Sequence, residues 1–192
     1  CSDIFNLVKK FRINNKGTPI VLMGYLNPIE RMGYDLFAKS ASESGVDAVL
    51  VVDLPHEEAE DVVNIFKRYN LESIFLIAPN TKTERIKKIA NYASGFLYYV
   101  SREEVTGERE DLAGDLKERV QTIREHTNLP VVVGFGISNL AQVREVSSCA
   151  DGVVVGSALV NCISENLGDS VKISETIEEK VEALTTGLAR SS

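Results

Sequence analysis

The sequence predicts the α/β fold class and, within it, a (β/α)8 TIM barrel of which this chain carries only strands 3 to 8 and their helices. Apolar runs rich in β-branched residues alternate with amphipathic stretches, which is typical of parallel strands covered by helices. A doubly wound sheet is the alternative, but the only G-x-G, Gly134 to Gly136, is late and has no third glycine. Glycines after the last two strands favour a barrel, because its phosphate sites lie there.

Six strands are predicted, in the apolar runs at 19–25, 47–53, 73–78, 96–100, 130–136 and 152–156. Helices are predicted over the first dozen residues and at 30–43, 57–69, 83–92, 111–127, 139–146 and 174–189. No linker interrupts the alternation, so we expect a single partial barrel domain over 1–192. A barrel has eight strands in about 250 residues. Because the chain begins at Cys1 inside a helical pattern, we interpret it as a fragment whose first two β/α units are absent.

Composition excludes several classes of function. The net charge of −7 argues against nucleic acid and anionic membranes as partners, and no apolar run approaches the roughly 20 residues of a membrane span. Cys1, Cys149 and Cys162 form no C-x-x-C pair, which favours a reduced, cytoplasmic protein. His56 and His126 do not have metal-ligand spacing, so we expect no metal site, and His126 suits the dipole near the end of a predicted helix.

The strongest functional signal is a set of glycines that follow neighbouring strands. They are Gly107 in "VTG", Gly136 in "GFGIS", and Gly156, which Ser157 follows in "VGSAL". Backbone amides that converge beside a helix N-terminus bind an anion without any lysine. We therefore predict a phosphate site in which a phosphate oxygen lies against Gly136. The alternative is that these glycines only permit turns.

Each of the other candidate residues has two interpretations, one functional and one structural. Asp53 ends a predicted strand, where a carboxylate either acts on a ligand or caps the following helix. Tyr25 and Tyr98 lie near strand ends and either line a pocket or pack in the core. His56 is a candidate base or a surface residue. The segment 101–115, rich in charge and glycine, is either a mobile lid or a solvated loop.

At these residues the chain resembles the tryptophan synthase alpha subunit family. The stretches "LMGYLNPIERMG", "GVDAVLVVDLPHEEAE", "VTG", "VVVGFGIS" and "GVVVGSALV" have the order and spacing of that family, from about Thr18 to the last helix. The resemblance implies a TIM barrel that cleaves indole-3-glycerol phosphate to indole and glyceraldehyde 3-phosphate. It implies no cofactor in this chain, and a β subunit that carries PLP and forms an α2β2 tetramer with it.

The resemblance also implies roles for individual residues. The phosphate-binding positions are matched by Gly107, Gly136, Gly156 and Ser157. The lid threonine is matched by Thr106, the tyrosine next to the substrate by Tyr98, and a pocket-lining tyrosine by Tyr25. Surfaces that face the β subunit are matched by Asn27, Asp53 and Pro55. The family's catalytic glutamate and aspartate have no counterpart here and are expected upstream of Cys1.

Two functions fit these motifs. The first is the lyase reaction in tryptophan biosynthesis, although we expect the 192-residue chain by itself to be inactive. The second is a phosphate-binding barrel with little activity that mainly activates the β subunit. The lid favours the second, because Glu103 and Glu104 precede Val105 where the family usually has a glycine. Extra negative charge there would weaken the binding of a phosphate ester.

Overall fold

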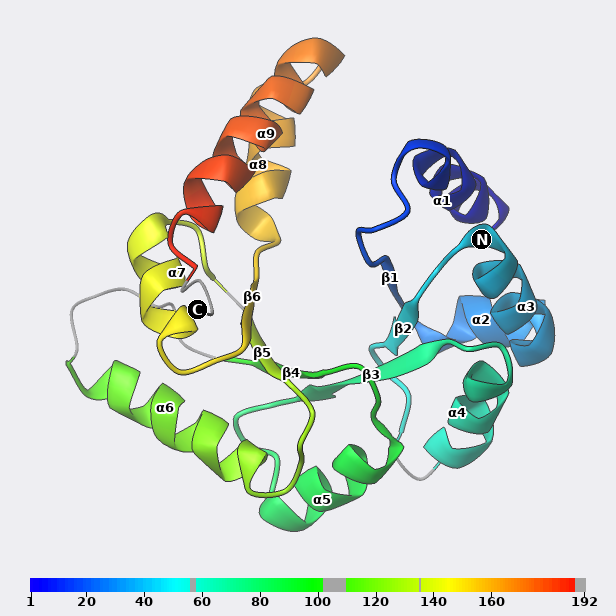
Figure 1. Ribbon diagram of the computed structural model, residues 1–192, viewed down its shortest axis with the longest axis horizontal. Coiled ribbons are helices and arrows are strands. Elements are labelled where there is room, and N and C mark those ends of the chain that lie inside the picture. The colour runs from blue at the N-terminus through cyan, green and yellow to red at the C-terminus, as the bar shows by residue number, and fades with distance from the viewer. Residues whose placement is uncertain (56–57, 102–109, 135, 189–192) are drawn as a thin grey trace. The chain divides into compact units, whose positions relative to one another are not determined.

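The structure is a computed structural model that describes residues 1–55, 58–101, 110–134 and 136–188, without the side chains of 110–114 (Figure 1). The chain forms two compact units. Unit 1 comprises Cys1–Leu76 and Glu84–Leu97, and unit 2 comprises Ile77–Thr83 and Tyr98–Ser192. A single domain over 1–192 remains a prediction. No helix among the described residues is long and apolar enough to cross a membrane.

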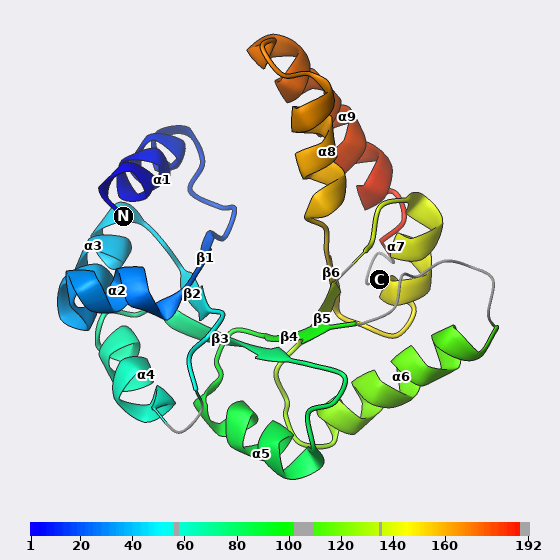
Figure 2. The same cartoon turned by 180° about the vertical axis from the view of Figure 1, so that it is seen from behind.

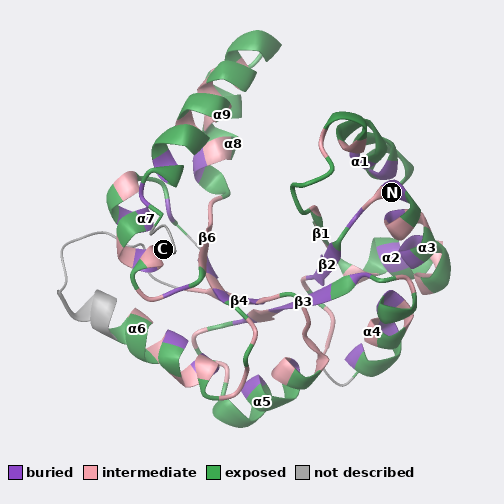
Figure 3. Cartoon of the chain, viewed as in Figure 1, coloured by how far each residue is buried: buried purple, intermediate pink, exposed green. Residues whose placement is uncertain are grey.

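Unit 1 contains the first three predicted strands. They are β1 (Val21–Gly24), β2 (Ala48–Val51) and β3 (Glu72–Ile77), which lie side by side in that order and run parallel. Val21 pairs with Ala48, and Ala48 with Glu72. All four residues of β2 are buried, as the purple ribbon of Figure 3 shows. An unbroken apolar strand between two neighbours is what the sequence predicts here.

Helices cover these strands and close the core of unit 1. They are α1 (Ser2–Asn14), α2 (Leu26–Met32), α3 (Tyr34–Ser44), α4 (Ala59–Arg68) and α5 (Thr83–Tyr92). The view from behind in Figure 2 agrees with Figure 1 that α1 lies beside α3, and α3 also contacts α4. The rings of Phe5, Phe37 and Phe66 join these three helices, with centroid distances of 5.7 and 6.1 Å. Burial of these aromatic rings, together with the aliphatic residues around them, holds the helices together.

One helix prediction is wrong. The single helix expected at 30–43 is two helices, α2 and α3, that meet at Gly33, whose φ is +87°. A side chain rarely adopts this φ, so glycine is needed at the break. The start was also placed too late, because Pro28 lies in the first turn of α2, where its missing N–H has no intrahelical partner to lose.

Unit 2 contains the other three predicted strands, β4 (Leu97–Val100), β5 (Val131–Gly134) and β6 (Gly152–Val154), again neighbours in sequence order. Its helices are α6 (Glu110–Arg124), α7 (Leu140–Ser147), α8 (Ser157–Glu165) and α9 (Ser170–Thr185). Helix α6 packs on β5, α7 packs on β6, and α9 contacts both α7 and α8. Val131 and Val133 are fully buried beneath these helices.

The last helix begins four residues earlier than predicted. Asp169 caps α9, because its carboxylate accepts a hydrogen bond of 3.0 Å from the N–H of Lys172. Helix α6 begins at Glu110, close to the predicted start at 111, so residues 110–115 belong to this helix and not to the lid or solvated loop expected at 101–115. That helix ends at Arg124, so His126 lies in the turn beyond it and not inside a helix.

Candidate functional site

The predicted phosphate-site glycines of unit 2 follow neighbouring strands at the same end. The last paired residues of the parallel strands β5 and β6 are Gly134 and Val154, and Gly136 and Gly156 each lie two residues further on. Adjacent strands are about 4.8 Å apart. Gly136 has a φ of +71°, which favours glycine whether or not a ligand is bound. The structure therefore places both glycines just beyond the same end of two paired strands, and their role in a phosphate site stays a prediction.

The N-terminus of α8 is open to a ligand. Gly156 is its N-cap residue and Ser157 is its first residue, and both are exposed. No side chain caps this helix among the described residues, whereas Asn139 caps α7 and Asp169 caps α9. The carbonyl of Gly156 accepts hydrogen bonds from Leu159 and Val160. The amides of the first turn and the Ser157 hydroxyl thus face solvent at the positive end of the helix dipole, which attracts an anion.

A capping box that the sequence interpretation missed fixes the loop after Gly136. The side chain of Gln142 is buried, and its oxygen accepts hydrogen bonds of 2.8 Å from the N–H of Ser138 and 3.3 Å from that of Asn139. The Asn139 side chain accepts in return from the N–H of Gln142. The signal is the spacing Asn-x-x-Gln before an apolar stretch, which is typical of a helix start. The N-terminus of α7 is thus capped by its own side chains, whereas that of α8 is not.

Tyr98 lies against Gly134, on the face of β5 opposite the buried valines. A Cβ added at Gly134 would be 2.6 Å from the Tyr98 hydroxyl oxygen and 2.8 Å from Cβ of Val154. This contact explains why the apolar strand ends in a glycine. Partial burial raises the pKa of the Tyr98 hydroxyl, so it stays a neutral hydrogen-bond donor at pH 7. Tyr98 and the two strand-end glycines therefore belong to one unit.

The residues predicted to face a partner lie in unit 1. The Asp53 carboxylate accepts a hydrogen bond of 2.7 Å from the N–H of Leu26, the first residue of α2. Asp53 therefore caps α2, and of its two interpretations the one in which it caps the helix after Pro55 is not borne out among the described residues, because α4 follows Glu58 and has no side-chain cap. Asn27 is exposed on α2, and Pro55 is half-buried. Tyr25 is the N-cap residue of α2 and is 63% exposed, so it is not a core residue.

Several predicted site residues lie outside the described part of the chain. They are His56, Glu103, Glu104, Thr106 and Gly107. Their assigned roles stay predictions. The roles assigned to Tyr25, Asn27, Asp53, Pro55, Tyr98, Gly136, Gly156 and Ser157 also stay predictions, although the structure fixes their places in the fold.

Parallel strands in sequence order, each followed by a helix, place the chain in a class of fold, the (β/α)8 barrel. Comparison with known proteins then gives the family. The sequence profile described as "Tryptophan synthase alpha chain" matches residues 1–189. The chain belongs to the tryptophan synthase alpha chain family.

Individual relatives agree with this assignment. The tryptophan synthase alpha chain of Opitutus terrae is 48% identical over 189 residues, which are 98% of this chain and 71% of that protein. That of Legionella pneumophila is 46% identical over 165 residues, which are 86% of this chain and 61% of that protein. The present chain is therefore shorter than these relatives.

Solved structures confirm the fold class. The alpha chain of Legionella pneumophila has a TM-score of 0.86 at 39% identity, covering 98% of this chain and 69% of that one. A chain of the tryptophan synthase α2β2 complex of Pyrococcus furiosus has a TM-score of 0.84 at 40% identity, covering 95% of this chain and 72% of that one. The strands of this chain thus follow the course of an alpha-chain barrel.

Proposed function

We propose that this chain is the phosphate-binding part of an alpha subunit that cleaves indole-3-glycerol phosphate to indole and glyceraldehyde 3-phosphate in tryptophan biosynthesis. The observation that carries the proposal is the uncapped N-terminus of α8, which follows Gly156, with Gly136 beyond the same end of the neighbouring strand. Amides there bind the phosphate, and the Ser157 hydroxyl adds a donor. Tyr98, held against Gly134 in the same unit, lies next to the substrate.

The bond-breaking step needs groups that this chain does not obviously supply. In a retro-aldol cleavage, indole C3 gains a proton, a glycerol hydroxyl loses one, and the carbon–carbon bond between the two fragments breaks. Positioned acids and bases contribute about 10²–10⁴-fold to such proton transfers. The family resemblance assigns both to a glutamate and an aspartate outside residues 1–192. We therefore expect ligand binding without turnover.

Gly156→Ala tests the phosphate site with little risk to the fold. A Cβ at Gly156 meets nothing within 4 Å, so alanine causes no clash, and it adds a methyl group at the N-cap residue of the helix whose first amides bind the anion in this proposal. Binding of glyceraldehyde 3-phosphate, measured by calorimetry, should weaken at least tenfold. Gly17→Ala is the matched control, because a Cβ there also meets nothing within 4 Å, and it should bind like the wild type. Equal binding by Gly156→Ala would overturn the proposal.

Turnover is tested separately. The purified 192-residue chain should release no indole from indole-3-glycerol phosphate above background. Release of indole that disappears in Asp53→Asn would show that Asp53 is a catalytic group in this chain, contrary to its cap contact with Leu26.

The partner in this proposal is a PLP-containing β subunit, and unit 1 supplies the surface. The hydrogen bond from the N–H of Leu26 to Asp53 links the start of α2, which carries Asn27, to the loop after β2, which carries Pro55. Hydrogen exchange with and without a β subunit should show protection over 53–58. An unchanged pattern there would contradict this interface. Stimulation of the β subunit without indole formation would favour the activator function.

A further inference from the structure

A short turn follows β3 and is closed by its own hydrogen bonds. It comprises residues 78–81 and belongs to unit 2, together with Ile77 at the end of β3. The N–H of Thr81 donates to the carbonyl of Ala78 at 3.0 Å, and the N–H of Ala78 donates to Oγ1 of Thr81 at 3.0 Å. The turn therefore has a defined shape, although Ala78 and Asn80 are exposed.

A helix supplies a third contact to this turn, through Arg119 in α6. Nη2 of Arg119 donates a hydrogen bond to the carbonyl of Thr81, which lies 38 residues away in sequence. Arg119 is half-buried, and its Nε is buried without an acceptor among the described residues. A buried donor without an acceptor lowers stability. The clearest effect of this arginine is therefore local, because it holds the turn against α6.

The contact reaches across the end of one strand. Helix α6 packs on β5, the turn follows β3, and β4 lies between these two strands. Tyr98, which is predicted to lie next to the substrate, is on β4. Arg119 therefore fixes the turn relative to the strands whose ends form the candidate site.

The turn lies at the same end of the sheet as the anion site but away from the phosphate. The carboxyl ends of parallel strands meet at one face of a barrel. Two strand spacings of about 4.8 Å separate β3 from β5, so the turn is roughly 10 Å from the end of β5. Gly136 lies beyond that end. A phosphate group bound there does not reach the turn, whereas the far end of a longer phosphate ester does.

We propose that Arg119 is a positioning residue for the part of the ligand that is remote from the phosphate. This inference rests on the proposed function, because it takes a phosphate ester with an aromatic group as the ligand. Arg119 holds the turn at 78–81 through the carbonyl of Thr81, and the turn forms a wall beside the aromatic group. A wall that is already ordered loses little entropy on binding. Its loss therefore weakens the binding of a long ligand and spares that of a short one.

Two ligands of different length separate this role from the phosphate site. Arg119→Met keeps the apolar stem of the side chain and removes the donor. In calorimetry it should weaken the binding of indole-3-glycerol phosphate about tenfold and leave that of glyceraldehyde 3-phosphate within about twofold of the wild type. Arg119→Lys keeps a donor for the Thr81 carbonyl and should recover most of the affinity. Lys117→Met is the matched control: it removes the same charge from an exposed position of the same helix and should bind both ligands like the wild type.

A change in the turn itself gives an independent test. Thr81→Val removes the oxygen that accepts from the N–H of Ala78 and leaves Arg119 in place. It should reproduce the selective loss for indole-3-glycerol phosphate, whereas Thr81→Ser, which keeps the hydroxyl, should not. Unchanged binding of this ligand by Arg119→Met and Thr81→Val would overturn the inference, and so would an equal loss for both ligands. A wild-type chain that binds neither ligand would instead overturn the proposed function, and this inference with it.

Discussion

At two places, one in each unit, an aspartate that lies directly before a strand is hydrogen-bonded to the residue at or directly before the start of the preceding strand. We call these two places corners. In unit 1 the N–H of Asp47 donates to the carbonyl of Ile20 at 3.0 Å, and its Oδ2 accepts from the N–H of Ile20 at 2.6 Å. In unit 2 Asp151 makes the same pair of bonds to Val131, at 2.9 and 2.8 Å. Each aspartate sits directly before the next strand. The device therefore fixes where two parallel strands begin relative to each other.

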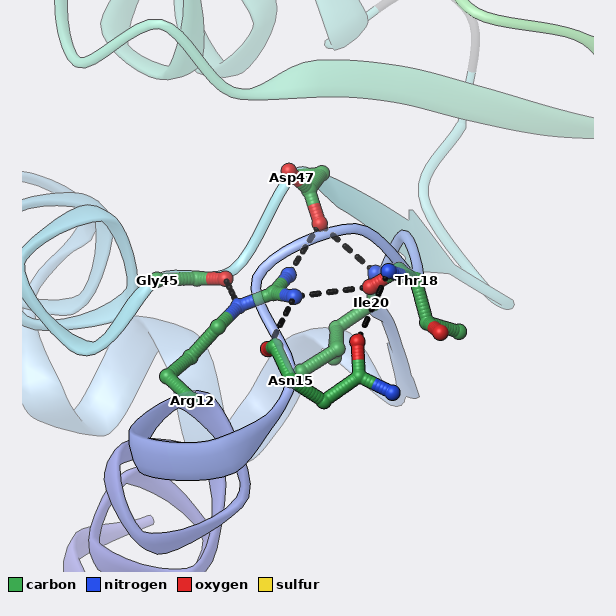
Figure 4. Close-up of polar contacts among 6 residues, drawn as sticks. All are labelled: Arg12, Asn15, Thr18, Ile20, Gly45 and Asp47. Carbon is green, nitrogen blue, oxygen red and sulfur yellow. Dashed lines mark hydrogen bonds and ion pairs between the residues drawn. The ribbon is translucent and has the colours of Figure 1, made fainter.

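Both corners also bind an arginine from the helix before the first strand, but the arginines differ. Arg124 contacts Asp151 at 2.8 Å and its side chain is 36% exposed. Arg12 contacts Asp47 at 2.5 Å, is 17% exposed, and also donates to the carbonyls of Gly45, Asn15 and Thr18 (Figure 4). Figure 4 shows its guanidinium among three chain segments. An exposed ion pair contributes little, so the carbonyl contacts decide the strength of this corner.

The largest effect should follow from removing Arg12. Arg12→Ala leaves the Gly45 and Thr18 carbonyls without the Arg12 donor and leaves Asp47 with only the N–H of Ile20, so we expect a loss of about 3 kcal/mol in the free energy of unfolding. Arg124→Ala should cost about 0.5 kcal/mol. Urea denaturation of both variants measures the difference. Equal losses would mean that the carbonyl contacts contribute nothing.

Gly45 lies against Arg12 at the same corner and provides a second test of it. It ends α3 with a φ of +93°, and the N–H groups of Gly45 and Val46 bond back to Ser42 and Ala41. A Cβ there would be 2.8 Å from Cγ of Arg12. Gly45→Ala should therefore cost about 2 kcal/mol, partly from backbone strain. In an Arg12→Ala background the contact is gone, so the additional cost should fall to the strain alone. Strict additivity in this double-mutant cycle would contradict the close approach.

The sequence predicts more of the strands than of these corners. All six strands were predicted because each is an unbroken apolar run, a signal that lies within the strand itself. The helix at 30–43 was wrong because Gly33 and Pro28 act through backbone geometry that periodicity does not report. Arg12 and Asp47 are 35 residues apart in sequence, so their contact exists only once the fold is formed.

The site divides in the same way. The places of Gly136, Gly156 and Ser157 after strands and at a helix start were predicted because these are local signals, whereas their binding of a phosphate stays a prediction. The hydrogen bond by which Asp53 caps α2 at Leu26 spans 27 residues. The sequence had suggested only a ligand or the helix after Pro55 for this carboxylate. The contact between Tyr98 and Gly134 was also missed, because it joins two strands. Long-range polar contacts are what the sequence did not disclose.

At a third corner, a serine takes the place of the aspartate and makes the same pair of hydrogen bonds. The hydroxyl of Ser94 accepts a hydrogen bond of 2.9 Å from the N–H of Ser73, and the N–H of Ser94 donates to the Ser73 carbonyl at 2.8 Å. Ser73 is buried, so Ser94→Ala should cost about 1 kcal/mol for the unpaired N–H. The loss should be the same at pH 4 and pH 7, because no charge is involved. A loss that changes between these pH values would contradict this assignment.

The smallest effect concerns the charge of Asp151. Partial burial alone would raise the pKa of this carboxyl, but the hydrogen bonds from Val131 and Arg124 and the charge of Arg124 lower it below its usual value. A lowered pKa stabilises the fold above the unfolded-state pKa, about 3.9, and this stability is lost as the pH falls through the folded-state pKa. Asp151→Asn keeps an oxygen for the N–H of Val131, and it removes the charge together with the second oxygen, which Arg124 contacts. Because the side chain is 42% exposed, we expect a loss of about 0.5 kcal/mol at pH 7 in low salt.

The difference in stability between this variant and the wild type should vanish below the folded-state pKa and shrink in 1 M salt, where charges are screened within about 3 Å. Urea denaturation between pH 3 and pH 7 measures it, and a difference that grows toward acid pH would show that the sign is wrong.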